Sequence, residues 1–332
     1  MDIGKFVISL DFELMWGVRD SRTIKNYGEN IMGVHTVIPK LLSMFSNYNI
    51  KGTFSTVGFL FFENKKELHK NLPEHKPQYK NKNLSPYENN FSEVEDNFEH
   101  EKYHFAPGLI KLIQDCPGQE IGTHTFCHYY CLEDGQTILD FREDIQKAIE
   151  VAQKYNIRIT SLVFPRNQFN SEYLKVCTEY GIICFRGNEK SWLYTAKSGE
   201  NETKVRRAFR LIDSYINISG EHCYSDEYMR DSVPVNIPAS RFLRPYSKKL
   251  KIFDTMRLHR IKSGMSHAAK NGLTYHLWWH PHNFGINQDE NFNFLENILI
   301  HYRDLHQKFH FQSYTMSGLA ELITTQPVSD ES

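Results

Sequence analysis

The chain has 332 residues, of which 40% are hydrophobic and 14% aromatic, so it can bury a sizeable core and is not a disordered protein. A formal net charge of −1 excludes a general nucleic-acid binder, because neutralising phosphates requires a clear basic excess. The six cysteines are scattered without a dense framework, which indicates reduced thiols in a cytosolic protein.

Strand-like and helix-like patterns alternate along the chain. Strands are expected at residues 5–10, 51–57, 120–122, 159–164, 182–185, 274–279 and 309–314. Helices are expected at residues 34–45, 106–114, 138–155, 171–180, 251–271 and 293–307, followed by a short terminal helix. Repeated strand–helix units predict a parallel sheet, open or closed into a barrel, with its ligand site beyond the carboxyl ends of the strands.

Two segments interrupt this alternation. Residues 64–104 are polar and punctuated by prolines, which predicts an excursion from the core after the second strand. Residues 197–245 are irregular in pattern. We predict one domain over residues 1–325 that carries both segments, and a tail at residues 326–332.

The N-terminal sequence gives an expectation about the cellular location of the protein. The apolar run 6–10 stops at Asp11, whereas the apolar region of a signal peptide has roughly 7–15 residues. No run reaches the roughly 20 apolar residues of a membrane span. The sequence therefore predicts a soluble, cytoplasmic protein without a transmembrane segment.

Two carboxylates stand where the first strand ends. Asp11 and Glu13 are separated by Phe12, so strand alternation points both to the same side. Two such carboxylates repel each other unless a cation or hydrogen-bond donors neutralise them. The pattern indicates either a catalytic or metal site, or a solvated pair in a loop.

The third strand runs into His124 and His128, four residues apart. On a helical turn such a pair shares a face and can bind one ion, although a structural role is the commoner explanation of a histidine pair. A structural zinc site with Cys127 and Cys131 is the rival interpretation. Four ligands on two turns of one helix cannot surround an ion, because Cys131 would lie roughly 10 Å along the axis from His124. Two histidines with a carboxylate from another strand fit better and leave a position for water.

Two further strand ends carry charged or titratable side chains. Arg166 follows Pro165 after the fourth strand and could hold a carboxylate through paired hydrogen bonds, or lie on the surface. His280 and His282 leave the apolar strand 274–279, where a histidine suits proton transfer near neutral pH. Either could equally be a hydrogen-bonded core residue.

Taken in order along the chain, these segments resemble the motifs of the NodB-like polysaccharide deacetylases, which form carbohydrate esterase family 4. The match covers nearly the whole chain, and its most specific part is the His-x-x-x-His motif with its Glu-Ile-Gly lead-in. The segments that carry the resemblance are Ser9–Glu13, Gly52–Gly58, Glu120–His128, Phe164–Arg166 and Leu277–His280.

The resemblance implies an α/β fold, a distorted (β/α) barrel with fewer than eight units. It also implies one divalent ion, with zinc as the first choice, held by Glu13, His124 and His128. Asp11 would then be the catalytic base and His280 the catalytic acid, although the roles of Asp11 and Glu13 could be reversed.

Further roles follow from the same resemblance. Arg166 would hold Asp11 ionised and oriented, and a backbone N–H near Tyr129 or Tyr130 would stabilise the oxyanion. Trp192 is the nearest candidate for a pocket wall, and Tyr129 and His282 are further candidates for substrate binding.

The implied function is metal-dependent removal of the N-acetyl group of an amino sugar in a glycan or glycan precursor. Without a visible export signal, the sugar is expected to be nucleotide-linked or lipid-linked. The basic segment 244–262 could meet a phosphate or an anionic membrane surface, or be a solvated helix face. Two alternatives remain: a hydrolase of a small cyclic amide, similar to allantoinase, and a catalytically inactive sugar-binding homologue.

Overall fold

A parallel β-sheet forms the centre of the computed structural model, which describes residues 2–88, 98–198 and 202–325. The strand order is β6-β5-β4-β3-β2-β1-β8-β7, and β9 also pairs with β1. Each of these pairings is parallel. The strands are β1 (Lys5–Phe12), β2 (Gly52–Thr56), β3 (Glu120–Thr123), β4 (Ser161–Leu162), β5 (Cys184–Phe185), β6 (Val235–Asn236), β7 (Arg241–Phe242), β8 (Thr274–Trp279) and β9 (Gln312–Tyr314).

The sheet curls into a distorted barrel because its two outer strands, β6 and β7, belong to one short segment. At the start of this segment, Ile237 N donates to Phe185 O of β5 at 2.9 Å. A few residues later, Ser240 N donates to His276 O of β8 at 2.8 Å. Residues 235–243 therefore connect one edge of the sheet to the other. The predicted fold class, a distorted (β/α) barrel with fewer than eight units, is confirmed.

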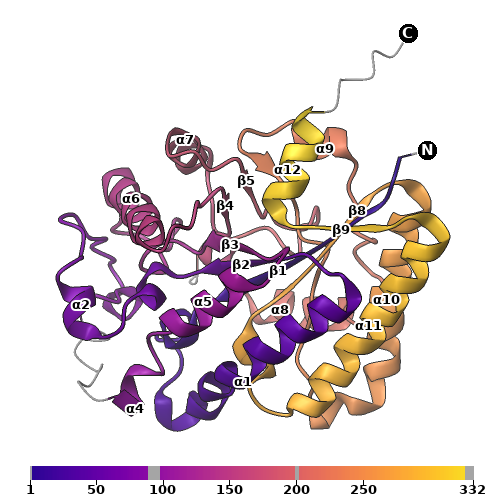
Figure 1. Cartoon of the computed structure of the whole chain (residues 1–332), viewed down its shortest axis with the longest axis horizontal. Helices are drawn as coiled ribbons and strands as arrows, with labels where there is room; N and C mark the ends of the chain where they lie inside the picture. Colours follow the sequence, from indigo (N-terminus) through magenta and orange to yellow (C-terminus); the bar gives the residue numbers. More distant parts are fainter. Residues whose placement is uncertain (1, 89–97, 199–201, 326–332) are drawn as a thin grey trace.

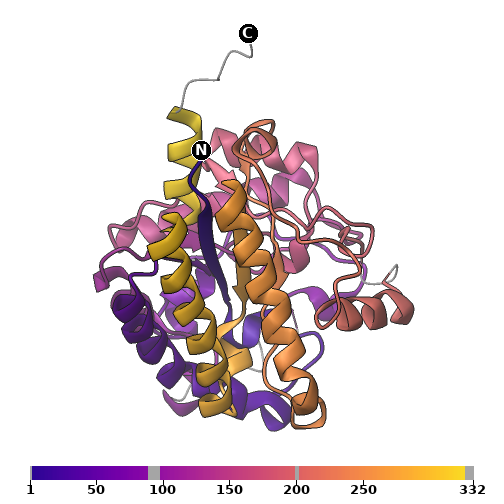
Figure 2. The same ribbon diagram turned by 90° about the vertical axis from the view of Figure 1, so that its right-hand side faces the viewer.

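Helices surround the strands (Figure 1), and α10 and α11 run side by side along one flank (Figure 2). The α-helices are α1 (Ile24–Tyr48), α2 (Lys65–His69), α4 (Phe98–Glu101), α5 (Pro107–Asp115), α6 (Ile138–Lys154), α7 (Ser171–Glu179), α8 (Lys204–Asp213), α9 (Asp226–Arg230), α10 (Asp254–Asn271), α11 (Gln288–Phe309) and α12 (Met316–Thr325). The 3-10 helices are η1 (Leu14–Gly17), η2 (Gly58–Phe61), η3 (Lys82–Leu84), η4 (Pro165–Asn167), η6 (Lys248–Phe253) and η7 (Pro281–Phe284). None of the described helices is long and apolar enough to cross a membrane.

Helix α6 shows how local sequence produces these elements. Thr137 caps its first turn: the Thr137 hydroxyl accepts from Asp140 N at 3.3 Å, and the Asp140 carboxylate accepts from Thr137 N at 2.8 Å. Phe141, Ile145 and Ala148 follow at helical spacing and are buried against the core. The cap fixes where the helix begins, and the apolar stripe fixes which face turns inward.

Three segments differ from the expected pattern. Helix α1 begins at Ile24, ten residues before the predicted start, although Gly28 and Gly33 disfavour a helix. The irregular segment 197–245 contains α8, α9, β6 and β7. The described part of the excursion 64–104 contains the short helices α2, η3 and α4. The predicted tail 326–332 lies outside the described residues, and the single-domain interpretation stays a prediction.

Strand β1 lies inside the sheet, between β2 and β8, and all eight of its residues are buried. It pairs with β8 through Lys5–Leu10 and with β2 through Ile8–Phe12. The carboxyl end of β1 therefore has the ends of β2 and β8 on either side, and Asp11 and Glu13 lie at that end.

The close approach of α1 to η7 gives a test of the fold. A Cβ on Gly33 would lie 2.1 Å from the carbonyl oxygen of Gly285, which is rigid backbone. We expect Gly33→Ala to lower the free energy of unfolding by roughly 1–3 kcal/mol, as overpacked cores do. Gly108→Ala in α5 is the matched control, since no described atom lies within 4 Å of its Cβ. Equal unfolding midpoints in urea for the two variants would contradict this packing.

Candidate active site

The Glu13 carboxylate lies at the centre of a buried group of histidines. Its Oε2 atom lies 3.1 Å from His128 Nε2 and 3.3 Å from His124 Nε2. Its Oε1 atom lies 2.9 Å from His282 Nε2. The His282 side chain therefore belongs to this cluster and is not among the residues that line the adjoining cavity, and its predicted role in substrate binding stays a prediction.

The His124–His128 segment is not a helical turn, contrary to the sequence-based expectation. Thr125 and His128 have φ angles of 65° and 60°, which lie in the left-handed region. The buried Asp144 carboxylate holds the loop by accepting from Phe126 N at 2.7 Å and Cys127 N at 3.0 Å. This irregular loop still brings the two imidazole rings within 4.9 Å of each other.

The donor set fits a divalent metal ion. One possible ligand group is Glu13, His124 and His128, and a second is Glu13, His280 and His282; within each group the ligand atoms lie within 4.8 Å of one another. His124 Nδ1 lies 2.8 Å from Val163 O, so Nδ1 carries the proton and Nε2 offers its lone pair to the centre. Two imidazoles and a carboxylate are ligands that zinc prefers, and neither group includes a cysteine.

The ionisation of these groups also suits metal binding. Burial lowers the pKa of His128 to about 3 despite its contact with Glu13, so the ring is neutral near pH 7. Burial alone would raise the pKa of Glu13, but His280 and the hydrogen-bonded histidines hold it well below its usual range. Neutral imidazoles and an ionised carboxylate are the forms that coordinate a metal.

Arg186 holds the second carboxylate, Asp11. Its Nη1 donates to Asp11 Oδ1 at 2.7 Å and its Nη2 donates to Oδ2 at 2.8 Å, in a fully buried bidentate pair. The guanidinium also lies 4.0 Å from the centre of the Trp278 ring. Burial tends to raise the pKa of Asp11, but Arg186, His124 and His280 together lower it by more than burial raises it. The net pKa is below its usual value, so the carboxylate stays ionised.

Arg186 is the residue that the sequence analysis missed, and Arg166 does not have the predicted position. Arg166 forms ion pairs with Asp20 and Glu133 instead of Asp11. Arg166 has a φ of 54°, in the left-handed region, and its side chain lines the same cavity as Asp11. The sequence feature that could have identified Arg186 is its position at a strand end. Arg186 is the first residue after β5, at the same edge of the sheet as Asp11.

The structure also corrects three other predicted roles: substrate binding by Tyr129, an oxyanion-binding N–H near Tyr129 or Tyr130, and a pocket wall formed by Trp192. Tyr129 is fully buried, and its hydroxyl donates to Gln136 and Thr137 instead of facing the pocket. The N–H of Tyr129 donates to Thr125 Oγ1 at 2.7 Å and that of Tyr130 to Tyr79 Oη at 2.8 Å, so neither N–H is free for an oxyanion. Trp192 is 65% exposed and does not line the pocket.

His280 lies between the two carboxylates and the pocket. Its Nε2 atom is 3.6 Å from Asp11 Oδ2 and 3.7 Å from Glu13 Oε1. Its Nδ1 atom is 3.3 Å from Asn283 Oδ1, which orients the ring. Burial lowers the pKa of His280, although the two carboxylates raise it.

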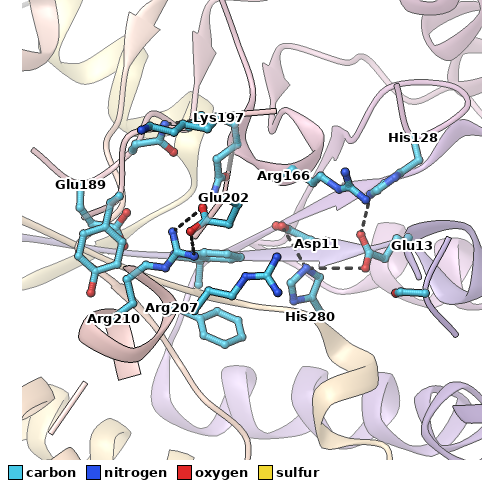
Figure 3. A pocket seen from close by; sticks show the side chains of 18 of the residues that line it. Asp11, Glu13, His128, Arg166, Glu189, Lys197, Glu202, Arg207, Arg210 and His280 are labelled. Carbon is cyan, nitrogen blue, oxygen red and sulfur yellow. Dashed lines mark hydrogen bonds and ion pairs between the residues drawn. The ribbon is translucent and has the colours of Figure 1, made fainter. Parts of the chain in front are cut away.

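A cavity of about 880 Å³ opens from these residues and has two chemically different ends. Figure 3 shows His128, Glu13, Asp11 and His280 at one end, and Lys197, Glu202, Arg207 and Arg210 at the other. Glu202 is paired with Arg210 at 3.1 Å. Arg207, Lys197 and the nearby Arg244 have no ion-pair partner among the described residues, so cationic side chains outnumber the carboxylates Glu202 and Glu189 at this end.

The overall fold is shared with solved structures of low sequence identity. A crystal structure of a protein described as a polysaccharide deacetylase, from Mycobacterium smegmatis, matches with a TM-score of 0.59 at 13% identity, over 98% of this chain and 96% of that one. A second such protein, from Pseudomonas aeruginosa PAO1, matches with a TM-score of 0.55 at 11% identity, over 98% and 92% of the two chains. A GH57-type branching enzyme from Pyrococcus horikoshii gives a TM-score of 0.51 at 12% identity, over 96% and 70%. The sequence matches no protein-family model and no curated protein.

The chain therefore has the NodB-like fold of the polysaccharide deacetylases that its motifs predicted. The same fold also supports a branching enzyme, so the fold alone leaves the reaction open. The reaction has to be inferred from the side chains of the site.

Gly17 provides a test of how the Glu13 carboxylate is positioned. A Cβ on Gly17 would lie 1.9 Å from Glu13 Cδ, so Gly17→Ala must displace the carboxylate. We expect this variant to lower the affinity for zinc by roughly tenfold or more, as changes beside metal ligands do. Titration with zinc measures the effect, and Gly108→Ala should bind like the wild type. Wild-type affinity in Gly17→Ala would show that the position of Glu13 does not matter for the ion.

The Arg186–Asp11 pair makes a separate prediction about stability. Removing one partner of a buried ion pair leaves an uncompensated charge, so Arg186→Met should lower the free energy of unfolding by roughly 3–5 kcal/mol. Arg186→Lys should lose less, because it keeps the charge and loses only the paired geometry. Chemical unfolding measures both, with Arg142→Met, which breaks the exposed pair with Glu179, as a control that should change little. Equal losses for Arg186→Met and Arg142→Met would contradict the proposed importance of this pair.

Proposed function

We propose that this protein is a metal-dependent deacetylase that removes the acetyl group from an N-acetylated amino sugar in a glycan or glycan precursor. The observation that carries the proposal is the arrangement at one end of the cavity. A buried metal-ligand group, a carboxylate held ionised by Arg186, and His280 all lie within reach of one another. The fold shared with proteins described as polysaccharide deacetylases supports the same chemistry.

Glu13, His124 and His128 would hold the divalent ion, with zinc as the preferred metal for this donor set. When bound, such an ion lowers the pKa of a water molecule and polarises an amide carbonyl. Asp11 is the general base: its carboxylate, ionised by the bidentate contact with Arg186, takes the proton of the attacking water.

His280 is the general acid in this proposal. Asn283 orients its ring through Nδ1, so that Nε2 faces Asp11 and Glu13. Burial lowers the pKa of His280 and the two carboxylates oppose that effect; the protonated ring would give its proton to the amine as the carbon–nitrogen bond breaks. Without this proton the leaving amine would be too basic to depart.

The opposite end of the cavity supports a substrate that carries phosphate. Arg207, Arg244 and Lys197 can surround an anion with several donors, which suits a phosphate or diphosphate ester. Burial, with repulsion from Arg210, lowers the pKa of Arg244, and a bound anion would relieve that repulsion. A nucleotide-linked or lipid-linked N-acetyl amino sugar has both the acetamido group and the phosphate that the two ends require.

Metal content tests the ligand assignment. We expect about one divalent ion per chain in the wild type, and its loss in the His124→Ala/His128→Ala double variant, because two of the three ligands are removed. Elemental analysis of both purified proteins gives the answer. A wild type that binds no ion even after reconstitution would leave a metal-free hydrolase of a cyclic amide, or a sugar-binding protein.

Acetate release tests the reaction. We expect the metal-loaded protein to release acetate from a soluble phosphorylated N-acetyl amino sugar, and Asp11→Asn to lower kcat by roughly a hundredfold or more, as loss of a general base does. Metal content and the unfolding midpoint serve as controls for the variant. Acetate release that is unchanged in Asp11→Asn would remove Asp11 from the mechanism, and no release by the wild type from any N-acetyl sugar would favour the binding protein.

A further inference from the structure

Helix α8 has an apolar face that no other described element covers. Val205, Phe209 and Ile212 lie at helical spacing on this face, and all three are more than two fifths exposed. The opposite face is buried: Arg206 donates to backbone carbonyls, and Asp213 pairs with Arg241. In Figure 2, α8 lies at the right-hand edge of the molecule. The chain thus places a helix with buried charges inside and apolar side chains outside, the reverse of an ordinary surface helix.

This apolar surface extends beyond α8 in two directions. Trp192 packs against Phe209 with 6.3 Å between the ring centres. Tyr215 packs against Phe253 at 5.9 Å, which joins the end of α8 to η6 and the start of α10. We call this surface the α8 face; its large exposed apolar residues are Trp192, Val205, Phe209, Ile212, Ile216, Ile218, Ile252, Phe253 and Met256. They make up nine of the seventeen large apolar side chains exposed among the described residues, so exposed apolar surface is concentrated here.

Lysines flank the α8 face. Lys204 lies at the start of α8, and Lys248, Lys249 and Lys251 lie on η6; all four are exposed, and none forms an ion pair with another described residue. The predicted basic segment 244–262 is thereby reduced to these η6 lysines, Arg244 and Lys262. Two of its arginines are buried and serve the fold, since Arg257 pairs with Asp254 and Arg260 pairs with Glu221.

The α8 face adjoins the cationic end of the cavity. Arg207 and Arg210 lie on the same helix as Phe209 but line the cavity, and Arg244 lines it from the segment before η6. One helix therefore borders the cavity with arginines and presents apolar side chains to the outside.

We propose that the α8 face docks on an anionic lipid surface. An amphipathic helix with exposed aliphatic and aromatic side chains lies in the membrane interface, and flanking lysines strengthen its attraction to anionic headgroups. A second copy of the chain fits less well, because a two-fold contact would bring the same unpaired lysines together. The proposed function then rests on this docking for its substrate class: a lipid-linked, phosphorylated N-acetyl amino sugar taken from that surface.

Co-sedimentation with vesicles tests the docking. We expect the metal-loaded full chain to sediment with phosphatidylcholine vesicles that contain phosphatidylglycerol, and at least tenfold less with phosphatidylcholine alone. The triple variant Val205→Ser/Phe209→Ser/Ile212→Ser should lose at least tenfold in binding. The matched control Ile138→Ser/Leu139→Ser/Ile300→Ser, which removes three exposed apolar side chains elsewhere, should bind like the wild type. Lys248→Gln/Lys249→Gln/Lys251→Gln should weaken binding to the anionic vesicles and reduce its dependence on salt.

Three results would overturn the docking proposal: no sedimentation of the wild type, equal binding by the two apolar triple variants, or a wild-type dimer in light scattering that the α8 variant dissociates. The last would assign the face to a second copy of the chain. Acetate release from a soluble phosphorylated sugar separates this proposal from the proposed function. If release persists in the α8 variant while no protein binds vesicles, only the docking fails; if vesicles are bound and no acetate is released, only the deacetylase assignment fails.

Discussion

The burial of two carboxylates at the end of β1 is the constraint on which the site depends. Asp11 and Glu13 are only 3% exposed, and an isolated buried carboxylate would be protonated instead of ionised. The fold gives each of the two carboxylates a different kind of partner. Asp11 receives a permanent cation, Arg186, whereas Glu13 receives imidazole side chains that can share it with an ion. This difference in partners separates a carboxylate that stays charged from one suited to metal coordination.

The surrounding backbone is arranged to permit this burial. Gly17 leaves space for the Glu13 carboxylate, and the contact of Gly33 with Gly285 brings α1 against η7, which carries His282. The segment 235–243 closes the barrel beside β5, which ends one residue before Arg186. Packing far from the chemistry therefore fixes the distances within it, because these contacts involve backbone that cannot yield.

Sequence reasoning located most of the elements but could not foresee all of the site. Strand ends marked Asp11, Glu13, His124 and His280, because the carboxyl ends of parallel strands meet at one edge. The arginine that pairs with Asp11 is Arg186 and not the predicted Arg166, a tertiary contact that no periodicity reveals. Helix α1 begins ten residues before its predicted start, and the close contact of Gly33 with Gly285 of the η7 region is a tertiary feature that periodicity does not reveal.

The cavity carries opposite electrostatic preferences at its two ends, and this limits how a substrate can lie in it. The carboxylates at one end disfavour an anion, whereas Arg207 and Arg244 at the other end attract one. Under the proposed function, a phosphorylated sugar would be oriented by its charge, with the acetamido group directed to Asp11 and His280. Because Arg207 and Arg210 of α8 line the cationic end, the docking proposal places the group attached beyond the phosphate on the side of the α8 face. A lipid attached there could stay in a membrane while the sugar reaches the site, so one orientation accounts for both the arginines inside and the apolar side chains outside.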